Sequence, residues 1–453
     1  MGKKCRCTVG LLAAITMAVF MASCSEPFVD YIEEIADETS ANATDDAASS
    51  SSTPGGSSSS EKKADVKLSS SSTSSSSSEK IKDYLPINDT EYPYAGIPRI
   101  VIETEDHREI KDRETEIPAK LQIWGEKAPE SEIMELTIRG RGNSTWKYPK
   151  KPYAIKFEKK QKFLGMPKAK KWVMLANYRD RTLIRNAVAF EIARQTNIGW
   201  TPQGKFADVF LNGKPVGNYY ITEKIEIDKN RLNLSEDAYL LEFDKHYDEE
   251  YKFRTDLQDF PVNIKYPKQP TDSSFAYVKN YINETEKCIF ADTLCDVEKY
   301  IDLKSFVDYF IIYELAQNTE MKHPKSVYMH KESNEKLKMG PVWDFDWGTF
   351  NNQLTSIYSS NYFWYKQLKQ NRHFTEQLHN AWQSYNNVFE KLSSYIDSLA
   401  AYTEKSNNLN IKIWPIVKIQ EPIGDEDLDF ESATEMLKDA FRKRFLTLND
   451  AWG

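Results

Sequence analysis

Hydrophobic and polar residues alternate in several short segments of the chain, and turn-forming residues separate these segments. Alternation with a period of two is typical of strands that bury one face. The sequence therefore predicts a β-rich part in the first half of the globular region. The predicted strands cover residues 99–103, 119–124 and 134–141.

A hairpin is predicted where Asn212-Gly213 separates two further apolar segments, residues 206–211 and 216–222. An Asn-Gly pair favours a two-residue turn because both residues tolerate the positive φ that this turn requires. We therefore expect two antiparallel strands joined at this point.

Helical periodicity dominates the chain after Ile301, with interruptions at residues 326–330 and 337–345. An earlier helix is predicted at residues 174–193, where apolar side chains recur at helical spacing and Asp180 is suited to act as the N-cap. The predicted fold class is therefore α+β, with an N-terminal β-rich part and a helical C-terminal part.

Composition divides the chain near residue 82. Residues 24–82 consist largely of Ser, Thr, Ala, Asp, Glu and Lys, and they lack the apolar side chains whose burial offsets the entropy cost of folding. We predict that they form a disordered Ser-rich tether. The remaining sequence is rich in aromatic residues and can bury a large core. Within it we assign residues 83–135 to a β-rich segment and residues 136–453 to the main domain.

Residues 1–23 have the features of a signal peptide. A positively charged start precedes an apolar stretch at residues 9–20, which is too short to cross about 30 Å of hydrocarbon. The next four residues, Met-Ala-Ser-Cys, resemble a bacterial lipobox, and this implies cleavage before Cys24 and acylation of that cysteine. We therefore expect an exported protein, lipid-anchored to a bacterial membrane and either periplasmic or at the cell surface. Ordinary cleavage near Ala22 with an incidental cysteine is the alternative.

The formal net charge of the chain is −8, and loss of the signal peptide with its three positive charges would make it −11. A protein this acidic has no electrostatic attraction to a phosphate backbone, so we predict no nucleic-acid partner. Anionic lipids would repel it too. Membrane attachment would therefore depend on the acyl chains on Cys24.

Two cysteines, Cys288 and Cys295, lie outside the signal peptide and the predicted lipidation site. Their short separation allows a disulfide in an oxidising compartment, and two independent buried thiols are the alternative. Neither cysteine lies near a Cys/His cluster, so the sequence predicts no zinc site.

A glycine-containing turn between two predicted strands is a candidate phosphate-binding element. Gly142 precedes Asn143 and Ser144, and the next strand region carries Lys151 and Lys156. Such a turn can direct backbone N–H groups toward phosphate oxygens, and a lysine on the following strand can reach the same charge. A solvated β-hairpin would have a similar sequence, so both interpretations remain open.

Two acidic segments form a candidate cation site. Glu314 and Asn318 are four residues apart and would share one face of a helix. Asp344 and Asp346 would point to the same side of an extended segment. Carboxylate and amide oxygens without His or Cys suit a hard cation such as Mg²⁺ or Mn²⁺. A structural ion-pair network with nearby lysines is the alternative.

Five phrases, taken in order along the chain, resemble the CotH family, which is named for a spore-coat protein. The resemblance runs from about Ile97 to the C-terminus. It implies a protein-kinase-like fold and transfer of phosphate from ATP to serine-rich proteins with a divalent cation. The phrases are RGNSTW at 141–146, KPYAIKF at 151–157, WVMLANY at 172–178, NG at 212–213 with GNY at 217–219, and GPVWDFD at 340–346.

The resemblance also implies roles for single residues. Asp344 resembles the metal-binding aspartate of a kinase's Asp-Phe-Gly, with Asp346 beside it, and Asn318 would be a second metal or phosphate contact. Glu320 would be the catalytic carboxylate. The family's kinases tend to have Asn-x-Asp in this segment, whereas this chain has Asn318-Thr319-Glu320.

The resemblance places the nucleotide beside the β-rich part. Lys156 would be the lysine that contacts the α- and β-phosphates, with Lys151 as the next choice. Glu223 and Ile225 would border the adenine, and the turn at Asn143 and Ser144 would complete the cofactor site.

Two functions follow from these observations. The first is an atypical protein kinase that phosphorylates Ser/Thr residues of secreted or surface proteins, with ATP and Mg²⁺ or Mn²⁺ as cofactors. The second is a non-catalytic cell-surface scaffold or adhesion module of the same fold, with a link to polysaccharide degradation as one form of this alternative. A glycoside hydrolase that uses Asp344 and Asp346 is disfavoured, because two residues so close on one strand leave no room for a sugar between them.

Overall fold

The computed structural model describes residues 83–453 except 292–294, 347, 352–355, 416–423 and 426. The predicted signal peptide, the lipidation site Cys24 and the predicted tether at residues 24–82 lie outside the described residues. In the part of the chain that is described, no helix combines the length and the apolar character needed to cross a bilayer.

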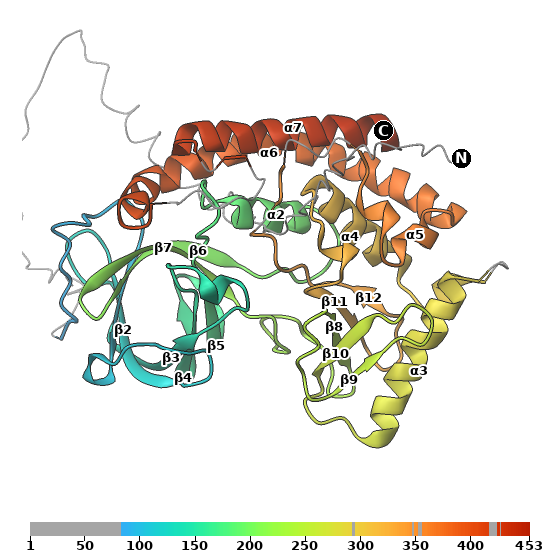
Figure 1. Cartoon of the computed structure of the whole chain (residues 1–453), viewed down its shortest axis with the longest axis horizontal. Helices are drawn as coiled ribbons and strands as arrows, with labels where there is room; N and C mark the ends of the chain where they lie inside the picture. The colour runs from blue at the N-terminus through green and yellow to red at the C-terminus, as the bar shows by residue number, and fades with distance from the viewer. Residues whose placement is uncertain (1–82, 292–294, 347, 352–355, 416–423, 426) are drawn as a thin grey trace, which may run out of the picture.

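A closed barrel of seven strands forms the first half of the described chain, as Figure 1 shows in blue and green. Neighbouring strands are antiparallel, except that the first and the sixth run parallel and close the barrel. Around the barrel the order is β1-β2-β3-β4-β5-β7-β6. Their bounds are β1 Arg99–Thr104, β2 Ile117–Trp124, β3 Met134–Gly140, β4 Tyr153–Phe163, β5 Met166–Leu175, β6 Gly204–Leu211 and β7 Lys214–Glu223.

The alternation of apolar and polar residues explains the barrel. Ile138, Ile155 and Trp172 are buried inside it together with side chains from the other strands. Their sequence neighbours Arg139, Lys156 and Lys171 therefore lie on the outer face, because successive side chains of a strand point to opposite sides.

A second, five-stranded antiparallel sheet follows, with the order β12-β11-β8-β10-β9. Helix α3, Asp272–Ile289, lies along it (Figure 1), and Val278 and Ile282 of that helix share a core with Leu241 and Phe243 of the sheet. The strands are β8 Tyr239–Phe243, β9 Lys252–Arg254, β10 Pro261–Tyr266, β11 Val327–Lys331 and β12 Lys338–Met339.

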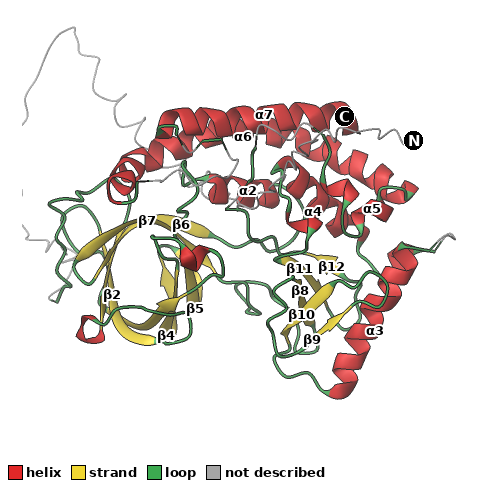
Figure 2. Ribbon diagram, in the orientation of Figure 1, coloured by secondary structure: helices red, strands yellow, loops and turns green. Residues whose placement is uncertain are grey.

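The remaining helices form a layer across the barrel and the second sheet, as Figure 2 shows in red. Two long helices in this layer pack against each other along the chain's C-terminal part. Apolar residues of the first recur every three or four positions, for example Phe374, Leu378 and Trp382, so one face is buried. The helices are α2 Arg185–Arg194, α4 Leu303–Leu315, α5 Tyr365–Leu368, α6 Arg372–Ile413 and α7 Phe430–Trp452.

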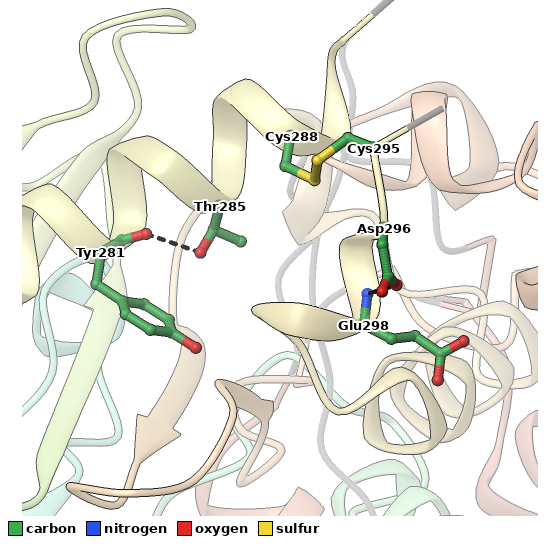
Figure 3. Close-up of a disulfide and its surroundings, with 6 residues drawn as sticks. All are labelled: Tyr281, Thr285, Cys288, Cys295, Asp296 and Glu298. Atoms are coloured by element: carbon green, nitrogen blue, oxygen red, sulfur yellow. Dashed lines mark hydrogen bonds between the residues drawn. A yellow bond between two sulfur atoms is a disulfide. The ribbon is translucent and has the colours of Figure 1, made fainter. Parts of the chain in front are cut away.

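The two cysteines form a disulfide, which was one of the two alternatives left open by the sequence (Figure 3). Cys288 lies in the last turn of α3, and its Cα is 5.4 Å from the Cα of Cys295. Asp296 then caps a short 3-10 helix by accepting a hydrogen bond from the N–H of Glu298. The disulfide therefore fixes where the chain leaves α3.

The strand and hairpin predictions and the α+β class are confirmed, but the helix predicted at residues 174–193 is wrong in its first half. Met174 and Leu175 belong to β5, where they pair with β7. Leu183 has a φ of 58°, which no α-helix accommodates, and α2 begins only at Arg185. Asp180 accepts a hydrogen bond from the N–H of Arg185 at 2.8 Å without being its N-cap residue.

The β-rich part is a closed barrel, which the sequence did not predict, and the protein-kinase-like fold remains a prediction. The predicted boundary between residues 83–135 and 136–453 falls inside β3. The barrel therefore takes its strands from both predicted segments.

A buried polar network ties the barrel to helix α6. Asp208 of β6 accepts hydrogen bonds from Tyr92 Oη at 2.9 Å and Ser406 Oγ at 2.5 Å, both through Oδ1. Asn218 of β7 donates to the same Ser406 Oγ at 2.8 Å. Burial raises the pKa of Asp208 to about 6, although the two hydrogen bonds to its carboxylate favour the charged form.

This network predicts a pH dependence of stability. Because the folded pKa of Asp208 lies above its unfolded value, the folded state binds the proton more tightly, and its stabilising contribution is lost as pH rises from about 4 to about 6. The loss is at most about 3 kcal/mol, since one pKa unit corresponds to about 1.4 kcal/mol. Urea denaturation of Asp208→Asn between pH 4 and 7 should show a flatter profile than the wild type. Asp450→Asn, an exposed change on α7, should leave the wild-type slope, and an unchanged slope in Asp208→Asn would contradict this account.

Candidate functional site

A cleft of about 1090 Å³ lies between the outer face of the barrel and the second sheet. Lys156 and Lys171 of the barrel contribute to one wall, and Leu240 and Glu242 of β8 contribute to the opposite wall. The linker that follows β7, residues 224–227, closes one side. The barrel and the second sheet lie side by side beneath the helical layer in Figure 1, in agreement with this arrangement.

Asp344 and Asp346 both line the floor of the cleft. Asp344 has a φ of 64°, so the prediction of an extended segment is wrong here, although both carboxyl groups reach the same cleft. Ser326 Oγ donates to Asp344 Oδ2 at 3.3 Å. Burial raises the pKa of Asp344, whereas Lys325 and Arg141 oppose the rise. Burial, followed by the charge of Asp344, raises the pKa of Asp346 to about 8.

Two arginines face this acid pair. Arg141 follows β3 and Arg179 follows β5, and the charge of each acts on Asp346. Arg179 Nη1 donates to Tyr148 Oη at 2.9 Å, and its guanidinium lies over the ring of that tyrosine. Arg141 lies over the ring of Trp343, 5.8 Å from its centroid. The floor of the cleft thus combines two half-buried carboxyl groups with two guanidinium groups.

The predicted phosphate-binding turn borders the same floor. Gly142 has a φ of 82°, and a Cβ at this position would lie 2.1 Å from Thr145 Oγ1, so the turn requires glycine. Arg113 Nη1 donates to the carbonyl oxygen of Gly142 at 2.9 Å and to Asn143 Oδ1 at 2.7 Å. Asn143 and Ser144 both line the cleft.

Asn318 and Glu320 hold the floor from the side of α4. Asn318 Nδ2 donates to the backbone oxygen of Asp344 at 3.2 Å, and its Oδ1 accepts from the N–H of Glu320 at 2.8 Å. Asn318 is buried and does not line the cleft. Glu320 lines it and forms an ion pair with Lys325 at 2.7 Å. The side-chain amide of Asn318 therefore fixes the backbone at Asp344 and at Glu320.

The other predicted site residues divide between the cleft and its surroundings. Lys156 lies in the wall, where it forms a partly exposed ion pair with Glu116 at 2.8 Å. Lys151 is outside the cleft lining and donates to the backbone oxygen of Trp146 at 2.7 Å. Glu223 is buried outside the cleft lining and accepts from the N–H of Gln203 at 2.9 Å. The cleft brings together Asn143, Ser144, Lys156, Ile225, Glu320, Asp344 and Asp346, but not Lys151, Glu223 or Asn318.

Asp244, which the sequence analysis missed, lies at the end of β8 and also lines the cleft. Burial is the main cause of the raised pKa of Asp344, and the charge of Asp244 raises it further. Asp244 Oδ2 accepts from the N–H of Ser326 at 3.2 Å. An acidic residue directly after the apolar run of β8 was a detectable signal. Nothing in the local sequence, however, indicated that this strand would lie beside the segment with Asp344.

The donor set fits a hard divalent cation. Both floor acids are half-buried, and desolvation raises the pKa of each; a cation would neutralise the like charges they carry when ionised, and oxygen ligands suit Mg²⁺ or Mn²⁺. In the described part of the chain no three His, Cys, Asp or Glu side chains are grouped to hold a metal ion. Asp344 and Asp346 could therefore supply part of the coordination, and phosphate oxygens or water would have to complete it.

The sequence model of one family, described as CotH kinase protein, matches residues 138–448. The chain belongs to the CotH family. No curated protein matches the chain. The CotH match begins in β3 and ends in α7, so it includes the acid pair, both arginines and the second sheet but leaves out β1 and β2.

Glu314 serves the architecture of the CotH domain and does not line the cleft. Helix α4 ends at Leu315 and Gln317 has a φ of 59°, so the prediction that Glu314 and Asn318 share a helix face is wrong. Glu314 is fully buried against α7, where it forms an ion pair with Arg444. Arg444 Nε also donates to the Glu314 backbone oxygen at 2.6 Å. This pair joins α4, which leads into the floor, to the C-terminal helix.

Loss of the Arg444 guanidinium should destabilise the CotH domain strongly. Arg444→Met leaves a buried carboxylate without its partner, and we expect the free energy of unfolding to fall by about 3–5 kcal/mol. Arg442→Met, an exposed change on the same helix, should have little effect. Glu314→Leu combined with Arg444→Met should recover much of the loss, because it removes both charges. Urea denaturation measures all three variants, and a free energy of unfolding for Arg444→Met within about 1 kcal/mol of the wild type would contradict this role.

Proposed function

We propose that the chain is a CotH-like atypical protein kinase that transfers the γ-phosphate of ATP to Ser/Thr hydroxyls of secreted or surface proteins, with Mg²⁺ or Mn²⁺. The observation that carries this proposal is the floor of the cleft, where Asp344 and Asp346 face Arg141 and Arg179. Phosphoryl transfer is catalysed mainly by positioning and by charge stabilisation, and this arrangement offers both signs of charge in one place.

The floor residues have complementary roles in this proposal. Asp344 and Asp346 would hold the divalent cation, which neutralises phosphate charge when it is bound. Arg141 and Arg179 would contact the phosphate oxygens, because guanidinium groups match them in geometry and charge. Asn318 is a positioning residue, since its amide holds the backbone at Asp344 and at Glu320.

The outer wall would accommodate the rest of the nucleotide. Ile225 lines the cleft beside Val173 and Leu240, and these apolar side chains suit the flat face of a base. Lys156 would reach the phosphates after leaving Glu116. That exchange costs little, because the exposed ion pair is worth roughly 1 kcal/mol or less.

Glu320 would orient the acceptor hydroxyl. It lines the floor near Asp344, and its ion pair with Lys325 holds its carboxylate in place. Glutamate here is one methylene longer than the aspartate that the family's kinases tend to have. This difference favours the second candidate function, a non-catalytic surface scaffold or adhesion module, because a displacement of about 1 Å can cost roughly a hundredfold in rate.

We also propose an acceptor and a location. Ser/Thr-rich proteins at the surface would be substrates, and the chain's own serine runs within residues 24–82 would be within reach of the same molecule. The lipid on Cys24 would hold the protein to a bacterial membrane, on the periplasmic side or at the cell surface. Kinase activity of the exported protein would also require a source of ATP outside the cytoplasm.

Phosphate transfer can be tested directly. The full chain, incubated with γ-labelled ATP, Mn²⁺ and a serine-rich peptide, should transfer label, and Asp344→Asn should reduce the rate at least about a hundredfold because it removes a charge at the floor. Asp450→Asn, far along α7, is the matched control and should keep the wild-type rate. Equal label with Asp344→Asn would overturn the mechanism. Nucleotide binding without transfer would support the scaffold instead.

The acid pair should also control stability without a cation. In a chelator, Asp346→Asn should unfold at a higher temperature than the wild type above about pH 8, because it removes one of two half-buried like charges. Mn²⁺ with a non-hydrolysable nucleotide should raise the melting temperature of the wild type and not of the variant. A variant that is less stable than the wild type in chelator would contradict the charge argument.

A further inference from the structure

Positive side chains gather at one edge of the cleft, where the segment after β8 meets the segment that follows α4. The N–H of Lys245 donates to the backbone oxygen of Pro324 at 2.8 Å, so the two segments lie side by side. The second segment contains a short 3-10 helix, η4, Glu320–Lys322. We call this group the basic edge, and it consists of Lys245, Lys322, His323 and Lys325.

The basic edge carries more positive charge than its neighbours neutralise. Lys325 is paired with Glu320, and the Lys322 ammonium lies 5.7 Å from the ring centroid of Tyr362. Among the described residues, neither an ion pair nor a side-chain hydrogen bond engages Lys245 or His323, and both are exposed. An unrelieved concentration of like charge of this kind attracts anions.

The positive charges of the basic edge lower one another's pKa values. Partial burial, followed by the charges of Lys322, Lys245 and Lys325, lowers the pKa of His323. Partial burial and then Lys325 lower the pKa of Lys245, and Asp244 opposes the shift.

Asp244 offsets this charge only in part. Its Oδ1 accepts from the N–H of His246 at 2.7 Å and contacts the His246 ring at 2.6 Å. Its Oδ2 accepts from the N–H of Ser326. Its charge still acts on Lys245, but burial and the charge of Lys325 outweigh it, so the edge keeps a positive charge that attracts an anion from outside the described structure.

The position of the edge indicates what that group belongs to. Lys245 and Lys325 line the cleft, whereas Lys322 and His323 lie outside its lining. Among the charges that lower the pKa of Asp344, that of Lys325 has the largest effect. The edge therefore begins beside the floor and continues onto the surface. A nucleotide held in the cleft would leave the outer part uncovered, but a polypeptide that runs out of the cleft would cross it.

We propose that the basic edge binds an anionic side chain, a carboxylate or a phosphate, of the polypeptide acceptor next to the hydroxyl that receives phosphate. The inference rests on the proposed kinase function. It makes acidic or already phosphorylated serine-rich segments the preferred substrates. In a serine run each new phosphoserine would become the anion that favours the next transfer. Two of the chain's own runs, residues 57–60 and 74–78, are followed directly by Glu61 and Glu79.

Steady-state kinetics with four peptides test this preference. Each peptide carries a serine run followed by glutamate, phosphoserine, alanine or lysine, and the full chain is assayed with Mn²⁺ and ATP. Lys245→Met should lower kcat/KM for the glutamate and phosphoserine peptides by about tenfold, as expected for one charge-assisted contact, and should leave the alanine peptide unchanged. Lys336→Met, an exposed lysine in the turn before β12, is the matched control. The two anionic peptides also show whether carboxylate or phosphate is preferred.

Charge reversal sharpens the test. Lys245→Glu should favour the lysine peptide over the glutamate peptide, and the melting-temperature shift caused by Mn²⁺ and nucleotide should stay at the wild-type value. An equal loss for all four peptides, or a reduced nucleotide shift, would overturn the proposal.

Failure of the kinase function can be told apart from failure of this inference. If no peptide receives phosphate, fluorescence anisotropy of the same labelled peptides without ATP still measures binding at the edge. Tighter binding of the anionic peptides, weakened in Lys245→Met, would support the basic edge as a docking site. Equal binding of the glutamate, phosphoserine and alanine peptides would overturn it.

Discussion

The partial burial of two like charges at the cleft floor is the constraint on which the surrounding architecture depends. Asp344 and Asp346 line the cleft and are half-buried, and desolvation raises the pKa of each, so the pair is stable in its charged form only with compensating positive charge. The compensation comes from three separate parts of the chain: the end of β3, the loop after β5 and the segment after α4. Arg141, Arg179 and Lys325 must therefore converge for the floor to keep its charge balance.

Rigid connections behind the floor make this convergence possible. The interior of the barrel is filled by apolar side chains, so the outer face presents its polar residues in a fixed register. Asp208 joins the barrel to α6, and the pair of Glu314 with Arg444 joins α4 to α7. The barrel wall and the acid pair are thus attached to one helical layer, which sets the width of the cleft between them.

Local sequence patterns predicted the strands, the Asn-Gly hairpin and the two aspartates of the floor, because each depends on a few neighbouring residues. They did not reveal that the barrel closes, since the parallel pairing of β1 with β6 joins segments about a hundred residues apart. Glu223, which the family resemblance placed beside the adenine, is buried and does not line the cleft. The helix predicted from Met174 failed because tertiary pairing with β7 overrides helical periodicity.

Closure of the barrel also bears on where the protein can be divided. Strand β1 is hydrogen-bonded to β2 on one side and to β6 on the other. Strands β1 and β2 lie before the region that the CotH family shares, whereas β6 lies inside it. A fragment that begins at residue 138 would lose β1, β2 and residues 134–137 of β3, so what remains of β3 and the whole of β6 would become open sheet edges with unpaired backbone N–H and C=O groups. Such edges pair readily with other chains, and the excised fragment would aggregate instead of folding as a self-contained unit.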